Sequence, residues 1–114
     1  MTATQLPLLG AALTPYLVLV SIDAWMHEAS RKVPTVERWL HYCAGALFLG
    51  FLVALFGDMT GLALALFSVF GVLTVWDETV FHGQLAARER RVHFGAYVAL
   101  ALFVGAWVWL ERSA

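Results

Sequence analysis

The sequence predicts an all-α, integral membrane, up-down-up-down four-helix bundle formed by two repeated helical hairpins, in a single domain of residues 1–114. The chain is 61% hydrophobic and only 13% charged, whereas soluble domains are about half apolar and a quarter charged. A chain this short cannot hide so much apolar surface inside a soluble core. Four long apolar segments, separated by short polar connections, complete the argument for membrane helices.

The four segments cover residues 6–27, 36–57, 59–82 and 90–111, and each is close to the roughly 20 residues that span a bilayer. No basic region or cleavage site precedes the first segment, so we expect a retained helix, which tolerates Pro15. None alternates with a period of two, which argues against a membrane β-barrel. The turn G-D-M-T-G at 57–61 and two other short connections favour antiparallel neighbours, as in a bundle.

The two halves of the chain resemble each other. The stretch E-R-W-L-H-Y-C-A at 37–44 aligns with E-R-R-V-H-F-G-A at 89–96, and D-A-W-M-H at 23–27 aligns more weakly with E-T-V-F-H at 78–82. These matches indicate a duplicated hairpin whose halves begin on the same side of the membrane. Glycine and alanine at 43–50 and 95–101 favour close helix packing.

Basic residues predict the orientation. Of the seven Lys and Arg, all but Arg112 lie in or beside the two longer loops, which the positive-inside rule places in the cytoplasm. We therefore expect both termini outside, in a bacterial inner membrane. A net charge of −1 suggests no nucleic-acid partner. Membrane lipid is the expected partner, and an oligomer or larger complex remains open.

The strongest pattern concerns the four histidines, because each follows a carboxylate by four residues. The pairs are Asp23 with His27, Glu37 with His41, Glu78 with His82, and Glu89 with His93. Eight acids among 114 residues give this coincidence a probability of about 10⁻⁴, after allowing for the choice of spacing. Residues i and i+4 share one helical face, so each predicted helix presents one carboxylate and one imidazole.

Chain direction sorts these groups by depth into two layers, each with two histidines and two carboxylates. The layers are separated by about one helical turn, roughly 5–6 Å, at the cytoplasmic end. Four carboxylates inside a membrane are costly unless they are paired, and two divalent ions would cancel them. Imidazole and carboxylate suit iron first, then zinc or manganese, and not copper(I). The sequence thus predicts a metal site, most simply dinuclear, comparable in design to the di-iron carboxylate bundles.

Several neighbouring residues could support the ligands from behind: Asp77, Arg38, Arg90, Tyr42 and Tyr97. Asp77 could replace Glu78 as the ligand, although the spacing favours Glu78. The arginines could hydrogen-bond to ligating carboxylates or contact anionic lipid head groups. The tyrosines could serve redox or proton chemistry or simply pack at the interface.

Three functions fit this pattern. The preferred one is a di-iron oxidoreductase that uses oxygen or peroxide on a lipid-soluble substrate at the cytoplasmic face. The second is a non-redox metal-binding protein, either a structural zinc protein or a metal-handling one. The third is a small b-type haem electron carrier with His41 and His93 as axial ligands, which leaves the carboxylates unexplained.

Overall fold

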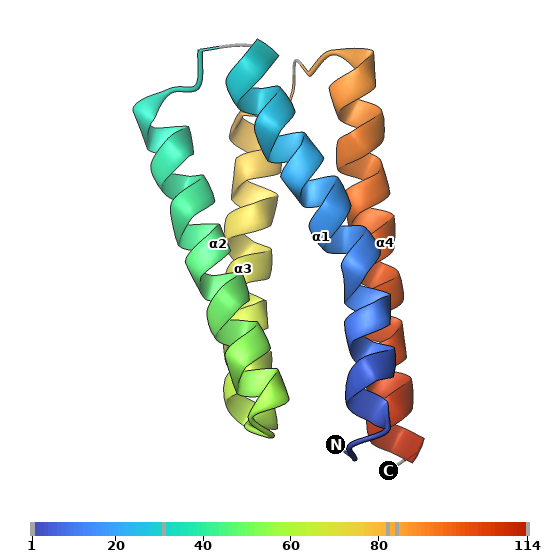
Figure 1. Cartoon of the computed structure of the whole chain (residues 1–114). Helices are drawn as coiled ribbons and strands as arrows, with labels where there is room; N and C mark the ends of the chain where they lie inside the picture. The colour runs from blue at the N-terminus through green and yellow to red at the C-terminus, as the bar shows by residue number, and fades with distance from the viewer. Residues whose placement is uncertain (1, 31, 82, 84, 114) are drawn as a thin grey trace. The chain divides into compact units, whose positions relative to one another are not determined.

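The computed structural model describes residues 2–30, 32–81, 83 and 85–113. It contains helices α1 (Gln5–Ser30), α2 (Thr35–Phe56), α3 (Thr60–Phe81) and α4 (Ala87–Ser113), and the described residues form no strand (Figure 1). The all-α prediction is confirmed. No observed helix end differs from its predicted position by more than three residues.

Helices α1 and α4 are longer than the predicted apolar segments, because polar residues at their ends continue the helix. The fourth helix begins at Ala87 rather than at residue 90, because A-R-E-R forms its first turn. Glu89 in that turn, and Glu37 in the first turn of α2, lie where the positive end of the helix dipole stabilises a carboxylate.

All four helices are long and apolar enough to cross a membrane. The shortest have 22 residues, which at about 1.5 Å per residue gives about 33 Å, slightly more than the hydrocarbon core of a bilayer. Large apolar side chains are exposed along every helix, among them Val18, Leu49, Val72 and Leu102. Such a surface is suited to lipid or to further helices rather than to water.

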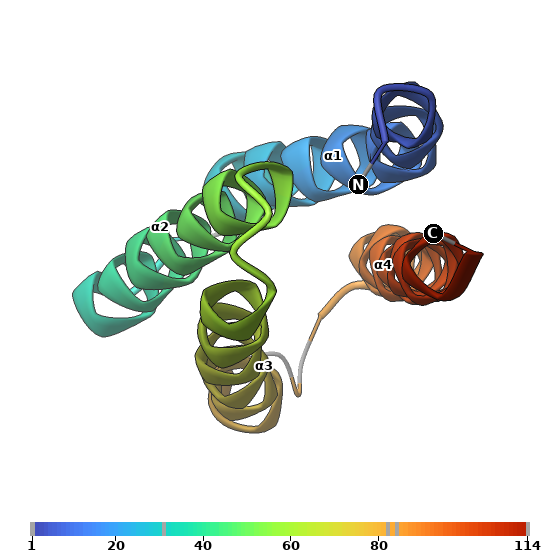
Figure 2. The same ribbon diagram turned by 90° about the horizontal axis from the view of Figure 1, so that it is seen from below.

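The chain divides into two compact units. The α1–α4 unit comprises Met1–Lys32 with Leu85–Ala114, and the α2–α3 unit comprises Val33–Gln84. Within the first unit α1 packs on α4, and within the second α2 packs on α3 (Figure 2). The single up-down-up-down bundle stays a prediction.

The α2–α3 unit is a tight helical hairpin, as the G-D-M-T-G turn predicts. After Gly57, Asp58 adopts a left-handed backbone with φ of 61°. The Asp58 amide donates to Leu55 O at 3.2 Å, and the Met59 amide donates to Ala54 O at 2.8 Å. This pair of bonds is a Schellman motif, which satisfies the last carbonyls of α2 and turns the chain into α3.

Aromatic packing holds α2 against α3. Phe48 and Phe51 on α2 meet Phe67 and Phe70 on α3, with centroids 5.2 Å apart for Phe48–Phe70 and 5.0 Å apart for Phe51–Phe67. These separations are in the favourable range for aromatic pairs. Gly50 allows close approach, because a Cβ there would lie 3.4 Å from Leu66 Cδ1.

The α1–α4 unit is an antiparallel pair built from the two ends of the sequence. Near one end of the pair, the Gln5 amide donates to Leu110 O at 3.1 Å. Buried residues on α4 recur every seven positions, at Glu89, Ala96, Phe103 and Leu110, the spacing that keeps one face toward a partner helix. On α1 the same spacing links Leu9, Tyr16 and Asp23, all buried.

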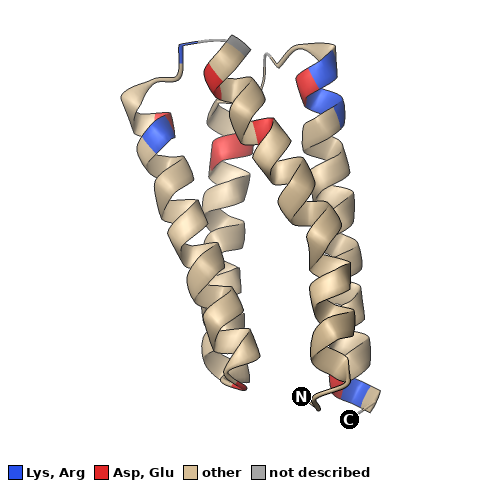
Figure 3. Cartoon of the chain, viewed as in Figure 1, with Lys and Arg blue, Asp and Glu red and all other residues tan. Residues whose placement is uncertain are grey.

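Charged residues gather at one end of each unit (Figure 3). In the α1–α4 unit they lie mainly at the end of α1 and the start of α4. In the α2–α3 unit they lie mainly at the start of α2 and the end of α3. In the α1–α4 unit, the seven-residue pattern thus ends in an acidic residue on each helix, Asp23 on α1 and Glu89 on α4.

Candidate metal centre

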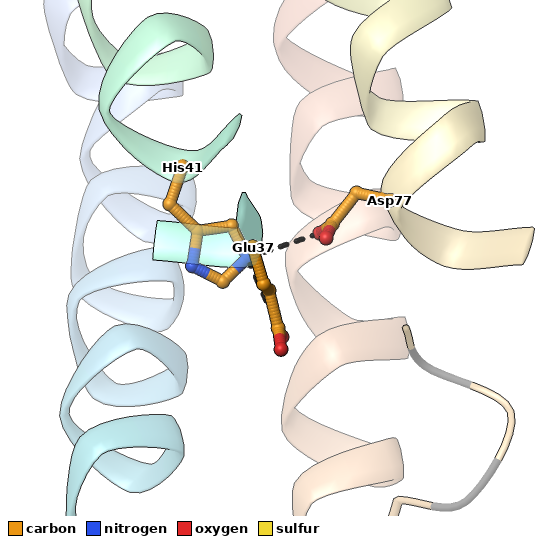
Figure 4. A group of neighbouring side chains, drawn as sticks. All are labelled: Glu37, His41 and Asp77. Carbon is orange, nitrogen blue, oxygen red and sulfur yellow. Dashed lines mark hydrogen bonds and ion pairs between the residues drawn. The ribbon is translucent and has the colours of Figure 1, made fainter. Parts of the chain in front are cut away.

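The α2–α3 unit brings two carboxylates and one imidazole together. Glu37 and His41 lie one turn apart near the start of α2, and Asp77 faces them from α3 (Figure 4). His41 Nε2 is 3.1 Å from Asp77 Oδ2 and 3.9 Å from Glu37 Oε1. One ligand atom from each residue lies within 4.8 Å of the other two.

These distances fit a metal ion after a small adjustment. Metal–ligand bonds of about 2.1 Å place neighbouring ligand atoms roughly 3.0–3.4 Å apart in octahedral or tetrahedral geometry. The contact between His41 and Asp77 already has that length. The Glu37 carboxylate is 3.9 Å from His41 Nε2 and within 4.8 Å of the Asp77 ligand atom, and a side-chain rotation can bring it closer to both.

The burial of the two carboxylates favours a bound cation in this group. The Glu37 side chain is 0% exposed, the Asp77 side chain 13%, and the His41 side chain 34%. Removing two carboxylates from water is costly unless a positive charge compensates them. In the structure, His41 Nε2–H donates to Asp77, and a divalent ion would replace that proton while supplying the charge.

The α1–α4 unit contains a second set of the same residue types. His93 Nδ1–H on α4 donates to Asp23 Oδ2 on α1 at 3.0 Å. His27 Nδ1–H donates to the main-chain oxygen of Asp23 at 2.9 Å. Asp23, His27 and Glu89 are buried, with exposed fractions of 8%, 2% and 4%.

The predicted ligands are therefore grouped by unit. Asp23, His27, Glu89 and His93 belong to the α1–α4 unit, and Glu37 and His41 belong to the α2–α3 unit. Within the α1–α4 unit, Asp23 contacts His93 across the two helices. The predicted ligand His82 lies outside the described residues.

Asp77 takes the place that the spacing had favoured for Glu78. The Asp77 side chain reaches His41, whereas Glu78 is exposed and is not part of the Glu37–His41–Asp77 group. The seven-residue spacing could have indicated this, because Ala63, Phe70 and Asp77 lie on one face of α3 and the first two are buried. Glu78 is turned about 100° from that face.

The other predicted neighbours differ in their contacts. The Tyr97 ring packs edge-on against His93, with centroids 4.8 Å apart. Tyr42 is exposed and packs edge-on against Trp39 at 5.9 Å. Arg90 donates from Nη2 to Leu85 O at 3.1 Å, which supports the loop before α4, and Arg38 is exposed. Tyr97 is thus in ring contact with a predicted ligand.

Comparison with known proteins identifies no family for this chain. No protein-family model, no curated protein and no solved structure matches this chain. The two sets of histidines and carboxylates are therefore the features that point to a function.

Proposed function

We propose that this protein is a membrane-embedded, non-haem metalloprotein, with iron as its metal, that oxidises a lipid-soluble substrate. The observation that carries this proposal is the Glu37–His41–Asp77 group, whose ligand atoms lie within 4.8 Å of one another near the ends of two apolar helices. Two carboxylates and an imidazole suit iron, zinc or manganese. Iron is the preferred metal because flexible carboxylate ligands accommodate a change of its oxidation state.

The proposed reaction removes two electrons and two protons from a reduced substrate such as a quinol. With peroxide as oxidant, both electrons and both protons go to one H₂O₂, which leaves as two water molecules. With oxygen, two substrate molecules are oxidised for each O₂, and two water molecules again form. Bound iron would supply the electron transfer. The chain would supply the ligands, offset their charge and hold the centre at the level of the lipid head groups.

The location of this centre is part of the proposal. The helices have the length and composition of membrane spans, and the Glu37–His41–Asp77 group lies near the start of α2 and the end of α3. These ends adjoin the basic loops, so we place the centre at the cytoplasmic face of the membrane, with both termini outside. A substrate dissolved in lipid could reach it from the side.

The test is to purify the protein in detergent without added metal or chelator, and to measure bound metal and the visible spectrum. We expect bound iron without a Soret band, and less bound iron in the His41→Ala variant. Zinc in place of iron would contradict the redox chemistry and favour the non-redox alternative. A Soret band would favour the haem carrier, and no metal in the folded wild-type protein would refute the proposal.

A further inference from the structure

We infer that the α1–α4 unit holds a metal ion of its own, so that the chain binds two divalent ions, one in each helical pair. The ligands of this second site are drawn from Asp23, His27, Glu89 and His93. The inference rests on the proposed function, since it extends metal binding from the Glu37–His41–Asp77 group to a second place.

The first argument is the equivalence of the two units. Asp23 accepts from His93 at 3.0 Å, and Asp77 accepts from His41 at 3.1 Å. In both units the aspartate lies near the end of one helix and the histidine near the start of the other. A buried glutamate stands one turn before each histidine, Glu89 at 4% and Glu37 at 0% exposure. The same chemical groups therefore recur in the same order.

The second argument is a buried oxygen of Asp23. While Oδ2 accepts the proton of His93, Oδ1 has no solvent exposure, and no hydrogen-bond donor among the described residues reaches it. His27 Nδ1 lies 3.7 Å from this oxygen, which is too far for a hydrogen bond. A buried carboxylate oxygen without a donor is strongly unfavourable, and a bound cation would satisfy it.

The hydrogen bonds of the two rings indicate which nitrogen would bind the ion. His27 Nδ1 lies 2.9 Å from the main-chain oxygen of Asp23, which can only accept, so Nδ1 carries the proton and Nε2 of the neutral ring carries the lone pair. A hydrogen bond from one ring nitrogen to a carbonyl is the usual support of a metal-binding histidine. His93 Nδ1 donates to Asp23 Oδ2 at 3.0 Å, and a divalent ion would replace that proton, as proposed for His41 and Asp77.

The spacing of the two rings is compatible with one shared ion. An imidazole bound at about 2.1 Å has its centre about 3.2 Å from the metal, so two rings on one ion have centres no more than about 6.4 Å apart. The centroids of His27 and His93 are 6.4 Å apart. That limit applies to rings on opposite sides of the ion, and tetrahedral geometry brings the centres to about 5.2 Å, so we expect the rings to move roughly 1 Å closer when the ion binds.

Charge balance gives the number of ions. Asp23 and Glu89 contribute two carboxylates to the α1–α4 unit, and Glu37 and Asp77 contribute two to the α2–α3 group. With neutral histidines, one divalent ion cancels the charge of each set. A second ion in either set would leave an excess of positive charge inside a membrane helix pair, which is costly.

The experiment titrates the metal-free, full-length protein in detergent with Co²⁺, and follows the cobalt absorption bands and the bound metal per chain. Two matched double variants remove one set each: Asp23→Asn with His93→Ala, and Asp77→Asn with His41→Ala. We expect two ions in the wild type and one in each double variant, with helical content checked by circular dichroism. Asp23→Asn alone, which keeps the side-chain shape, replaces the first double variant if that protein does not fold.

The outcomes separate the two proposals. One ion in the wild type, lost with Asp77 and His41 but kept without Asp23 and His93, would overturn the second site and leave the proposed function intact. Loss of both ions in either folded double variant would overturn separate sites in favour of one shared centre. No bound ion in the wild type would defeat the proposed function itself.

Discussion

Asp77 and Glu78 are adjacent acids on α3, yet they point in directions about 100° apart. Asp77 continues the buried face of Ala63 and Phe70 and reaches His41 at 3.1 Å, whereas Glu78 is exposed. A spacing of four residues from His82 had favoured Glu78. The position of a side chain around the helix axis, rather than its distance along the sequence from a histidine, decides which acid faces the partner helix.

At this scale we predict that Asp77→Asn weakens metal binding and Glu78→Gln does not. The amide of asparagine carries no charge and is a poorer ligand, so we expect a loss of at least about 10–100-fold in affinity, the range seen even for residues that only support a ligand. Competition of each variant with a chelator of known affinity measures the effect. Equal weakening in both variants would contradict the assignment of Asp77.

Each helix pair has a glycine that faces a side chain of the partner helix. On α2, a Cβ at Gly50 would lie 3.4 Å from Leu66 on α3, while a Cβ at Gly45 would meet nothing within 4 Å. Gly95 on α4 similarly faces Leu19 on α1, with a Cβ-to-Cδ1 distance of 3.6 Å. The glycine- and alanine-rich stretches therefore contribute to packing inside each unit, as membrane helix pairs commonly do.

The pair Gly50 and Gly45 gives a matched test on one helix. We expect Gly50→Leu to destabilise the protein by about 1–3 kcal/mol, because the added side chain overpacks the contact with α3. Gly45→Leu should have a much smaller effect, since both substitutions raise helix propensity equally and only the first meets a neighbour. Thermal unfolding in detergent compares them, and equal unfolding temperatures would argue against the α2–α3 contact.

On the scale of the whole molecule, the charged residues of each unit lie mainly at the end where its histidines lie (Figure 3). Six of the seven basic residues belong to the two longer connections or the helical turns beside them. This asymmetry is what orients a membrane protein during insertion. From these residues we therefore expect both candidate metal sets to lie near the cytoplasmic surface.

This orientation can be measured with reporter fusions. Alkaline phosphatase joined after residue 113 should be active and a green fluorescent protein at the same place should be dark, because the C-terminus is expected outside. The turn at 57–61 should give the same pattern. Insertions between residues 32 and 35 should give the opposite one, and a bright fluorescent protein at the C-terminus would reverse the proposed topology.

Much of this protein could be predicted from the sequence, because the relevant signals are local. Hydrophobicity located all four helices to within three residues, and the repeated four-residue spacing identified most of the acids and histidines that the structure buries or brings into contact. These features need no knowledge of distant contacts, because a helix fixes the relation between residues i and i+4 by its own geometry.

Two features required the tertiary structure. The pairing of α1 with α4 joins the two ends of the chain, and lipid-facing and helix-facing apolar surfaces have the same composition, so hydrophobicity cannot identify the partner. The contacts of Asp23 with His93 and of Asp77 with His41 depend on how each helix is rotated about its axis. That rotation is set by the packing of apolar side chains along the full length of each pair, and it decides which carboxylates meet which imidazoles.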